Sequence, residues 1–235
     1  MKQLIIQSKG GAGKSYLTKL LSLLADKEKK EKFFIDCDNS SASTTKFFSG
    51  IKDRKSSYVK FSNFNLLGSD RKIDRTKFDS FLAEIEKLEN VVADFGATSS
   101  DQLFFYMLEE QKNGIIQTFT EMDIQLLLVV AGGGSAKECV EFFNLANKIP
   151  GIGEITHLIA NEFQGGINGK SVKEYTNSKV QIGKLHDDPN SEAQREWDKL
   201  MIDGVVYSDI LKLSALRRRR IVNYLDDIFN QINSL

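Results

Sequence analysis

Seven residues near the start of the chain have the types and spacing of a site for phosphate groups. They read KGGAGKS over residues 9–15, after the apolar run 4–6 and before leucines at helical spacing. Glycines let the backbone turn so that successive N–H groups point at one anion. The helix start adds the positive end of its dipole, Lys14 adds a point charge, and the Ser15 hydroxyl can ligate Mg²⁺. We therefore predict a phosphate-binding loop.

One position departs from the usual G-x-x-x-x-G-K-[ST] pattern, because Ser8 stands where the first glycine is expected. A second lysine, Lys9, follows it directly. Glycine and lysine are also common in ordinary surface turns, which is the structural alternative. The register between a strand and an amphipathic helix favours the nucleotide-binding interpretation.

Three aspartates end apolar runs downstream of this loop. Asp36 and Asp38 follow residues 33–35, and Asp94 follows residues 91–93. Doubly wound sheets bind ligands at the carboxyl ends of their strands, and we expect the strand ending at Asp36 to lie beside the strand before the loop. Aspartates also cap helices and open turns.

We assign these acids separate expected roles around a phosphate and its metal. Asp38 would position the attacking water and Asp36 would lie in the outer sphere of Mg²⁺. Asp94 has the Walker B arrangement, in which the carboxylate holds Mg²⁺ through water. After it, Gly96 and residues 97–100 are expected to form a switch whose backbone N–H senses the γ-phosphate.

The hydrophobic pattern predicts an α/β fold, a doubly wound and mostly parallel sheet flanked by helices. Continuous apolar runs such as 126–131 are typical of strands covered on both faces. Strands are expected at 4–6, 33–35, 91–94, 126–131, 155–160 and 180–185, with an extended segment or extra strand within 58–67. Helices are expected at 15–25, 78–88, 101–112, 136–148, 191–201 and 216–235. Residues 26–32 are expected as a solvated turn, and residues 132–134 as a strand-to-helix turn with Ser135 as cap.

Length and composition favour one P-loop domain over residues 1–235. The formal net charge is +0, so no overall basic field predicts a nucleic-acid partner. Cys37 and Cys139 have no metal-ligand spacing and are expected as packed side chains. The start leaves no room for a signal peptide and no apolar run approaches a membrane span, so we expect a cytoplasmic protein.

The C-terminal segment predicts a helix with one apolar stripe, running through residues 216, 221, 225, 228, 232 and 235. Four consecutive arginines precede most of that stripe: Arg217, Arg218, Arg219 and Arg220. Three interpretations stay open, namely a stripe packed on the sheet with solvated arginines, a contact with the DNA backbone, and a membrane-surface helix. Asp226 and Asp227 weaken the membrane interpretation.

The form K-G-G-x-G-K-[ST] resembles the deviant Walker A motif of the ParA/MinD family of P-loop ATPases. The resemblance extends through DCD at 36–38, VVADFGA at 91–97 and NEF at 161–163. In its middle and end the chain is most similar to the TraL-like and MobD-like ATPases of plasmid conjugation, through DFGATSS, GGGSAKE and NEFQGGINGKSVKEY. The family often continues its first acidic motif with Pro-Gln, whereas Asn39 and Ser40 follow here.

The resemblance implies how the residues would be used. Lys9 would reach across a homodimer to the partner's ATP, and Asn161 would read the adenine, although a turn-forming Asn is the structural alternative. Pro189 lies in a loop that could close over the base. The residues expected to surround ATP·Mg²⁺ are Gly10, Gly11, Ala12, Gly13, Lys14, Ser15, Tyr16, Gly96, Asn161 and Pro189.

We therefore expect an ATPase that dimerises with ATP, hydrolyses it slowly and serves DNA transfer or partition of a mobile element with a partner protein. Two alternatives stay open: a metabolic enzyme similar to dethiobiotin synthetase, and a nucleotide-binding scaffold that barely hydrolyses.

Overall fold

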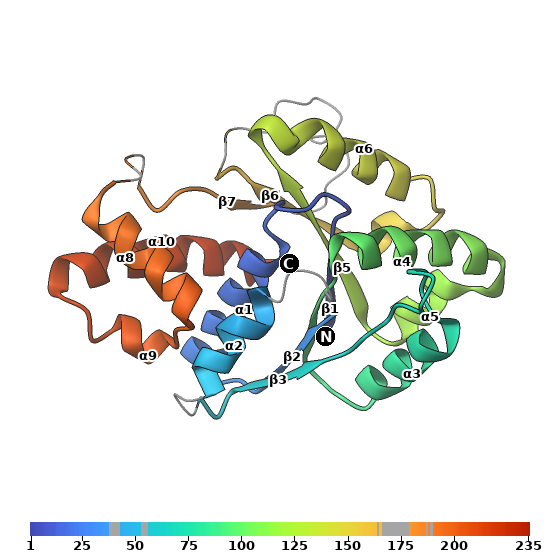
Figure 1. The fold of residues 1–235 in the computed structure, drawn as a ribbon, viewed down its shortest axis with the longest axis horizontal. Coiled ribbons are helices and arrows are strands. Elements are labelled where there is room, and N and C mark those ends of the chain that lie inside the picture. The colour runs from blue at the N-terminus through green and yellow to red at the C-terminus, as the bar shows by residue number, and fades with distance from the viewer. Residues whose placement is uncertain (38–42, 53–55, 164, 166–178, 187, 189) are drawn as a thin grey trace.

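A seven-stranded sheet forms the centre of the molecule in a computed structural model (Figure 1). The structure describes residues 1–37, 43–52, 56–163, 165, 179–186, 188 and 190–235. The strand order is β3-β2-β4-β1-β5-β6-β7, and every neighbouring pair is parallel. The strands are β1 (Lys2–Ile6), β2 (Lys32–Asp36), β3 (Val59–Asn63), β4 (Val91–Asp94), β5 (Ile124–Ala131), β6 (Thr156–Asn161) and β7 (Lys179–Ile182).

Helices cover both faces of the sheet, as Figure 1 shows. One face carries α1 (Lys14–Glu28), α2 (Ser43–Lys52), α8 (Glu192–Asp203), α9 (Tyr207–Ile210) and α10 (Ala215–Ile232). The other carries α3 (Arg75–Glu86), α4 (Ala97–Glu110), α5 (Ile115–Glu121) and α6 (Ala136–Ala146), with short 3₁₀ turns at Gln111–Asn113, Gly133–Ser135 and Ile152–Glu154. The predicted doubly wound α/β fold is therefore confirmed.

The sheet separates two hydrophobic cores. Successive side chains of a strand point to opposite faces. In β1, Leu4 and Ile6 therefore belong to the core under α3–α6, while Ile5 belongs to the core under α1, α2 and α8–α10. Both cysteines are buried and free, as expected.

The position of β2 corrects one expectation. The strand that ends at Asp36 does not lie beside β1, because β4 lies between them. Strand order depends on long-range pairing, which neighbouring residues do not encode. In consequence, Asp94 is in register with Ile5 on one side and with Asp36 on the other.

Several element boundaries also differ from expectation. Helix α1 continues to Glu28 and ends where Lys29 adopts a positive φ of 56°, so much of the expected turn is helical. Residues 97–100, expected as a switch segment before a helix at 101–112, form the first turn of α4. Ser135 precedes α6 without a side-chain capping bond, and β7 ends at Ile182 rather than at residue 185. Helices α2 and α5 were not predicted.

Candidate functional site

The glycine-rich loop connects β1 to α1 at the carboxyl end of the central strand. Gly11 and Gly13 have φ values of 75° and 104°, which lie in the left-handed region. A Cβ on Gly13 would also lie 2.2 Å from the Asn161 side-chain nitrogen. The backbone conformation and the close packing therefore both require glycine at position 13.

Asn161, at the end of β6, supports the loop from the side. Its Nδ2 donates to the Ala12 carbonyl at 2.8 Å, and its Oδ1 accepts from the Phe163 N–H at 3.2 Å. The residue is buried. In this structure its amide therefore contacts the loop and the following turn, and its role in reading a base stays a prediction.

Gln7, which was not among the predicted site residues, supports the loop through its side-chain amide. Its Nε2 donates to the Val129 carbonyl at 2.8 Å, and its Oε1 accepts from the Lys9 N–H at 3.2 Å. Its backbone N–H donates to the Ser100 hydroxyl at 3.1 Å. This fully buried amide ties the loop to β5 and α4. The position of Gln7, a polar residue directly after the apolar run 4–6, was the sequence signal that could have identified it.

The Lys14 ammonium lies within the loop. Its Nζ donates to the Gln7 carbonyl at 2.8 Å and to the Lys9 carbonyl at 3.4 Å, and the residue is buried. Two backbone carbonyls at the start of the loop thus hold the positive charge of Lys14. Lys14 can give its hydrogen bonds to phosphate oxygens from this position with little movement.

Asp94 is a buried carboxyl at the end of β4. Its Oδ2 accepts from the Thr44 hydroxyl at 2.5 Å, while its buried Oδ1 has no hydrogen-bond partner among the described residues. Burial raises the pKa of Asp94 to about 6, the negative charge of Asp36 adds to this, and the hydroxyls of Thr44 and Ser15 and the charge of Lys14 oppose it.

This arrangement fits a magnesium ion at Ser15 and Asp94. Mg²⁺ takes oxygen ligands, keeps several waters and is commonly bound through one or two carboxylates plus substrate phosphates. An unpartnered buried carboxylate oxygen beside a hydroxyl meets that requirement. Within the described ranges no group of three acidic, His or Cys side chains could hold a metal, so phosphate oxygens would have to complete the site.

Asp36 lies next to Asp94 on β2 and holds α2 in place. Its Oδ2 accepts from the Thr45 N–H at 3.1 Å and from the Thr45 hydroxyl at 2.6 Å. Thr44 and Thr45 thus bring the start of α2 to both carboxylates, and no sequence motif marked either threonine. Asp38 and Pro189 lie outside the described residues, so their expected roles stay predictions.

Gly96 precedes the first turn of α4, and its carbonyl accepts from the Ser100 N–H at 2.9 Å. Its φ of −60° does not demand glycine. Ser99 donates its hydroxyl to the Cys37 carbonyl at 3.0 Å. The segment after Asp94 is therefore bonded to the end of β2, and phosphate sensing by Gly96 stays a prediction.

Lys9 points away from the loop in this monomer. Its Nζ lies 2.6 Å from Glu138 Oε2 on α6, and both side chains are partly exposed. The hydrogen bond and charge of Glu138 raise the pKa of Lys9. Sequence reasoning did not select Glu138.

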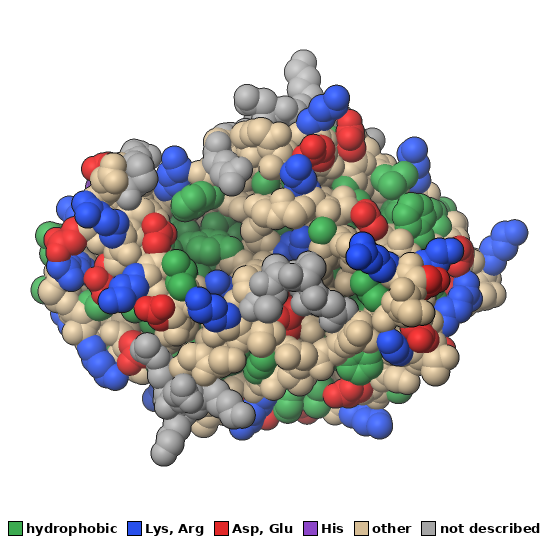
Figure 2. Space-filling view, viewed as in Figure 1, with side chains coloured by type: hydrophobic (Ala, Val, Ile, Leu, Met, Phe, Trp, Pro, Cys, Tyr) green, Lys and Arg blue, Asp and Glu red, His purple; other side chains and the backbone are tan. Residues whose placement is uncertain are grey.

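A cavity of about 530 Å³ continues from the loop toward α8. Figure 2 shows hydrophobic side chains gathered in a hollow on this side of the molecule. Tyr16 lines the cavity with its ring, while its hydroxyl bonds to Tyr224 and Trp197. The lining residues are Gly11, Gly13, Tyr16, Lys19, Asn161, Phe163, Asp198, Met201 and Ile202. Its place beside the loop and its apolar wall suit the nucleoside part of a nucleotide.

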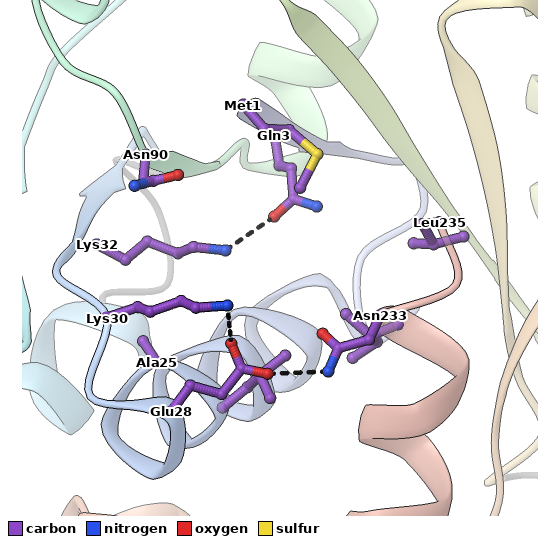
Figure 3. A pocket seen from close by; sticks show the side chains of 11 residues that line it. Met1, Gln3, Ala25, Glu28, Lys30, Lys32, Asn90, Asn233 and Leu235 are labelled. Carbon is purple, nitrogen blue, oxygen red and sulfur yellow. Dashed lines mark hydrogen bonds and ion pairs between the residues drawn. The ribbon is translucent and has the colours of Figure 1, made fainter.

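A second cavity, of about 200 Å³, lies at the opposite pole (Figure 3). The polar side chains that line it bond to one another. Glu28 accepts a hydrogen bond from Asn233 at 2.9 Å and forms an ion pair with Lys30 at 3.0 Å. Lys32 approaches the Gln3 amide oxygen at 3.4 Å. The amino ends of the strands border it, whereas ligands of such sheets bind at the carboxyl ends.

The C-terminal arginines do not act as one group. Arg217 pairs with Glu192 and Glu196 on α8, and Arg218 donates to the Leu211 carbonyl at 3.1 Å. Arg219 and Arg220 are exposed. The stripe of α10 is buried from Ile221 to Ile232, whereas Leu216 is exposed and Leu235 lies partly buried beyond the end of the helix, contrary to expectation. The described helices include none long and apolar enough to cross a membrane.

The chain is similar to known proteins in sequence and in fold. The chain is 25% identical to the Protein TraL of Escherichia coli over 98% of its length and 96% of that protein. Its fold is similar to McdA from Cyanthece (15% identity, 100% and 98% of the chains, TM-score 0.53). It is also similar to a Borrelia burgdorferi B31 protein described as a plasmid partition protein and solved with AMPPNP (14% identity, 97% and 98%, TM-score 0.50).

The family model of the CobQ/CobB/MinD/ParA nucleotide-binding domain matches residues 4–196, which include the glycine-rich loop, both strand-end aspartates Asp36 and Asp94, and the first turns of α8. The chain therefore belongs to the CobQ/CobB/MinD/ParA nucleotide-binding family.

Proposed function

We propose that this protein is an ATP-dependent dimerisation switch of the ParA/MinD type that hydrolyses ATP slowly. The observation that carries the proposal is the juxtaposition of Lys14, Ser15 and the buried Asp94 at one sheet edge. Asp94 keeps an oxygen without a partner among the described residues and a pKa near 6. Such a carboxyl is costly to bury in its charged form, and the positive charge of a magnesium ion held beside it with ATP would compensate this cost.

Each residue has a defined role in this proposal. The N–H groups of residues 10–15 and the Lys14 ammonium bind the β- and γ-phosphates, and Ser15 and Asp94 hold Mg²⁺, the latter through water. Magnesium supplies charge neutralisation at the phosphates. Asp38 would orient the attacking water, and Asp36 would help to hold the hydrated metal.

In this proposal, Lys9 makes dimerisation depend on ATP. In the monomer it pairs with Glu138, and we propose that it leaves this partner to contact the ATP of a second copy. The dimer is then favoured only while the γ-phosphate is present, so hydrolysis releases it.

We place this switch in the DNA transfer or partition of a mobile element, acting with a partner protein. Full-length similarity to a TraL protein supports this setting. Exposed Arg219 and Arg220 could add a contact with the DNA backbone.

Binding and assembly measurements test the proposal. ATP·Mg²⁺ should bind wild type in calorimetry, and Lys14→Ala should remove binding, whereas the exposed Lys148→Ala should not. A non-hydrolysable ATP analogue should shift wild type to a dimer in sedimentation, and Lys9→Ala should bind the analogue and stay monomeric. If Lys9→Ala dimerises like wild type, the trans-acting role of Lys9 is wrong. If wild type binds no nucleotide, the whole proposal is wrong.

A further inference from the structure

A directed chain of hydrogen bonds passes through Tyr16, the residue after Ser15 of the glycine-rich loop. The Trp197 indole N–H on α8 donates to the Tyr16 hydroxyl at 2.8 Å. The Tyr16 and Tyr224 hydroxyls lie 3.0 Å apart, and Tyr224 donates to the Gly183 carbonyl at 2.9 Å. A hydroxyl has one proton, so the proton of Tyr16 must go to Tyr224. The chain therefore runs in one direction through α8, α1, α10 and the end of β7.

The chain is held in the core. Trp197 is 1% exposed, and its ring packs edge-on to that of Tyr224 with centroids 5.9 Å apart. Burial raises the pKa of Tyr16 to about 12, so this hydroxyl keeps its proton at neutral pH. A buried donor that loses its acceptor is costly, so each link constrains the helices it joins.

Lys19 makes a second connection between the same two helices. Its ammonium donates to the Met201 carbonyl at 2.8 Å and lies 5.2 Å from the centre of the Phe47 ring. Residues three or four apart share a helix face. The bonds from Tyr16 and Lys19 therefore join one face of α1 to one face of α8, about one turn apart. Figure 1 shows α1, α8 and α10 together on this side of the sheet.

These two connections lie beside the cavity that continues from the glycine-rich loop. The loop forms one wall through Gly11 and Gly13, and α8 forms the facing wall through Asp198, Met201 and Ile202. The position of α8 relative to α1 therefore fixes the width of the cavity. The phosphate-binding N–H groups, by contrast, belong to the loop itself.

We propose that Tyr16 is a positioning residue for the nucleoside part of the nucleotide: its hydroxyl, through Trp197 and Tyr224, holds α8 at the spacing that the base and ribose require. The inference rests on the proposed function, because it presupposes that a nucleotide occupies the loop and this cavity. In this proposal the Tyr16 hydroxyl makes no direct contact with phosphate.

The test compares two ligands on one variant. Tyr16→Phe keeps the ring and removes only the hydroxyl. ATP·Mg²⁺ uses the loop and the cavity, whereas inorganic tripolyphosphate with Mg²⁺ uses the loop alone. We expect the Kd for ATP to rise on the order of tenfold and the Kd for tripolyphosphate to change less than about twofold. A purely structural role would weaken both ligands equally.

Tyr207→Phe is the matched control, because Tyr207 packs on the same core from α9 and lies outside the cavity lining. It should leave both constants unchanged. The single tryptophan of the chain adds a direct readout. Its emission should change in Tyr16→Phe and stay as in wild type in Tyr207→Phe, because only the first variant removes the acceptor of its N–H.

Tyr224→Phe provides a second variant if Tyr16→Phe does not fold, since Tyr224 is one link further along the chain and does not line the cavity. It should again weaken ATP more than tripolyphosphate. An unchanged ATP constant, or equal losses for both ligands, overturns the positioning role. If wild type binds neither ligand, the proposed function fails instead.

Discussion

At the scale of single residues, Asp94 combines a structural cost with a function. Its carboxyl is fully buried, and its pKa near 6 lies above the usual value of 3.8. Between these two pH values the folded protein holds a proton that the unfolded chain has released. Stability attributable to this group is therefore lost as pH rises toward 6 and stays lost above it.

We predict that Asp94→Asn stabilises the nucleotide-free protein at pH 8. A difference of this size between folded and unfolded pKa corresponds to an upper bound of roughly 3 kcal/mol, and the amide still accepts from Thr44. Denaturant unfolding at pH 8 and pH 4 measures the free energy of unfolding of both proteins. Most of the advantage of the variant should disappear at pH 4, which lies close to the unfolded pKa of 3.8: there the folded Asp94 is protonated and the unfolded carboxyl is about half protonated.

The same substitution on the exposed Asp203 is the control, and it should leave stability nearly unchanged at both pH values. In hydrolysis assays Asp94→Asn should be inactive, because the amide cannot hold the metal as a carboxylate does. If Asp94→Asn is less stable than wild type at pH 8, burial of the charged Asp94 carboxylate does not destabilise the folded protein.

At the scale of elements, α2 and α8 meet with almost no side chain between them. A Cβ on Gly50 of α2 would lie 2.1 Å from the Asp203 carbonyl at the end of α8. Gly204, which follows α8, has a φ of 80°, and a Cβ on it would lie 2.4 Å from the Phe47 carbonyl. This contact holds α2, which carries Thr44 and Thr45, against the helix that forms the cavity wall.

We predict that Gly50→Ala destabilises the protein by about 1–3 kcal/mol, because the added methyl forces backbone against backbone. Gly153→Ala is the matched control, since a Cβ at Gly153 would meet nothing within 4 Å. Thermal unfolding of the two variants should separate them clearly. Equal melting temperatures would show that the helices can part without cost.

Helix α2 also shows where sequence-based prediction stopped. Its buried residues Phe47, Phe48 and Ile51 have helical spacing, but the segment is short, polar elsewhere and follows a loop-like run. The continuous apolar strands and the long stripe of α10 were predictable because their periodicity is local. The glycine-rich loop and Asp94 were predictable because their chemistry demands fixed residue types.

The rest of the site depends on contacts between distant segments. Gln7 contacts Val129, Thr44 contacts Asp94 and Glu138 contacts Lys9 only because the fold brings these distant segments together. The same holds for the insertion of β4 between β1 and β2. No spacing within the sequence encodes these neighbours.

At the scale of the whole molecule, the Lys9–Glu138 pair bears on the proposed assembly of two copies. The pair is partly exposed, so solvent screens it and it contributes little to folding. It nevertheless occupies the lysine that we propose reaches a second copy. In the proposed switch, breaking this pair is therefore a step on the path from monomer to dimer.

We predict that Glu138→Gln increases the fraction of dimer at a given concentration of protein and non-hydrolysable ATP analogue, while the melting temperature of the monomer hardly changes. Sedimentation velocity at several protein concentrations measures the dimer fraction. Glu141→Gln, on an exposed neighbouring position of α6, is the control and should behave as wild type. A reduced dimer fraction in Glu138→Gln would mean that Glu138 supports the interface rather than restraining Lys9.

The side chains of β1 alternate between the two hydrophobic cores, and this alternation limits where residues can be inserted into or deleted from the chain. Leu4 and Ile6 face one core and Ile5 the other, and β1 is bonded on both edges. Adding one residue inside this strand would exchange its two faces and shift the glycine-rich loop against Asp94, whereas a residue added in the turn after α3 would alter neither. We therefore expect insertions and deletions in a lineage of such proteins to accumulate at helix ends, and the central strand to keep its length.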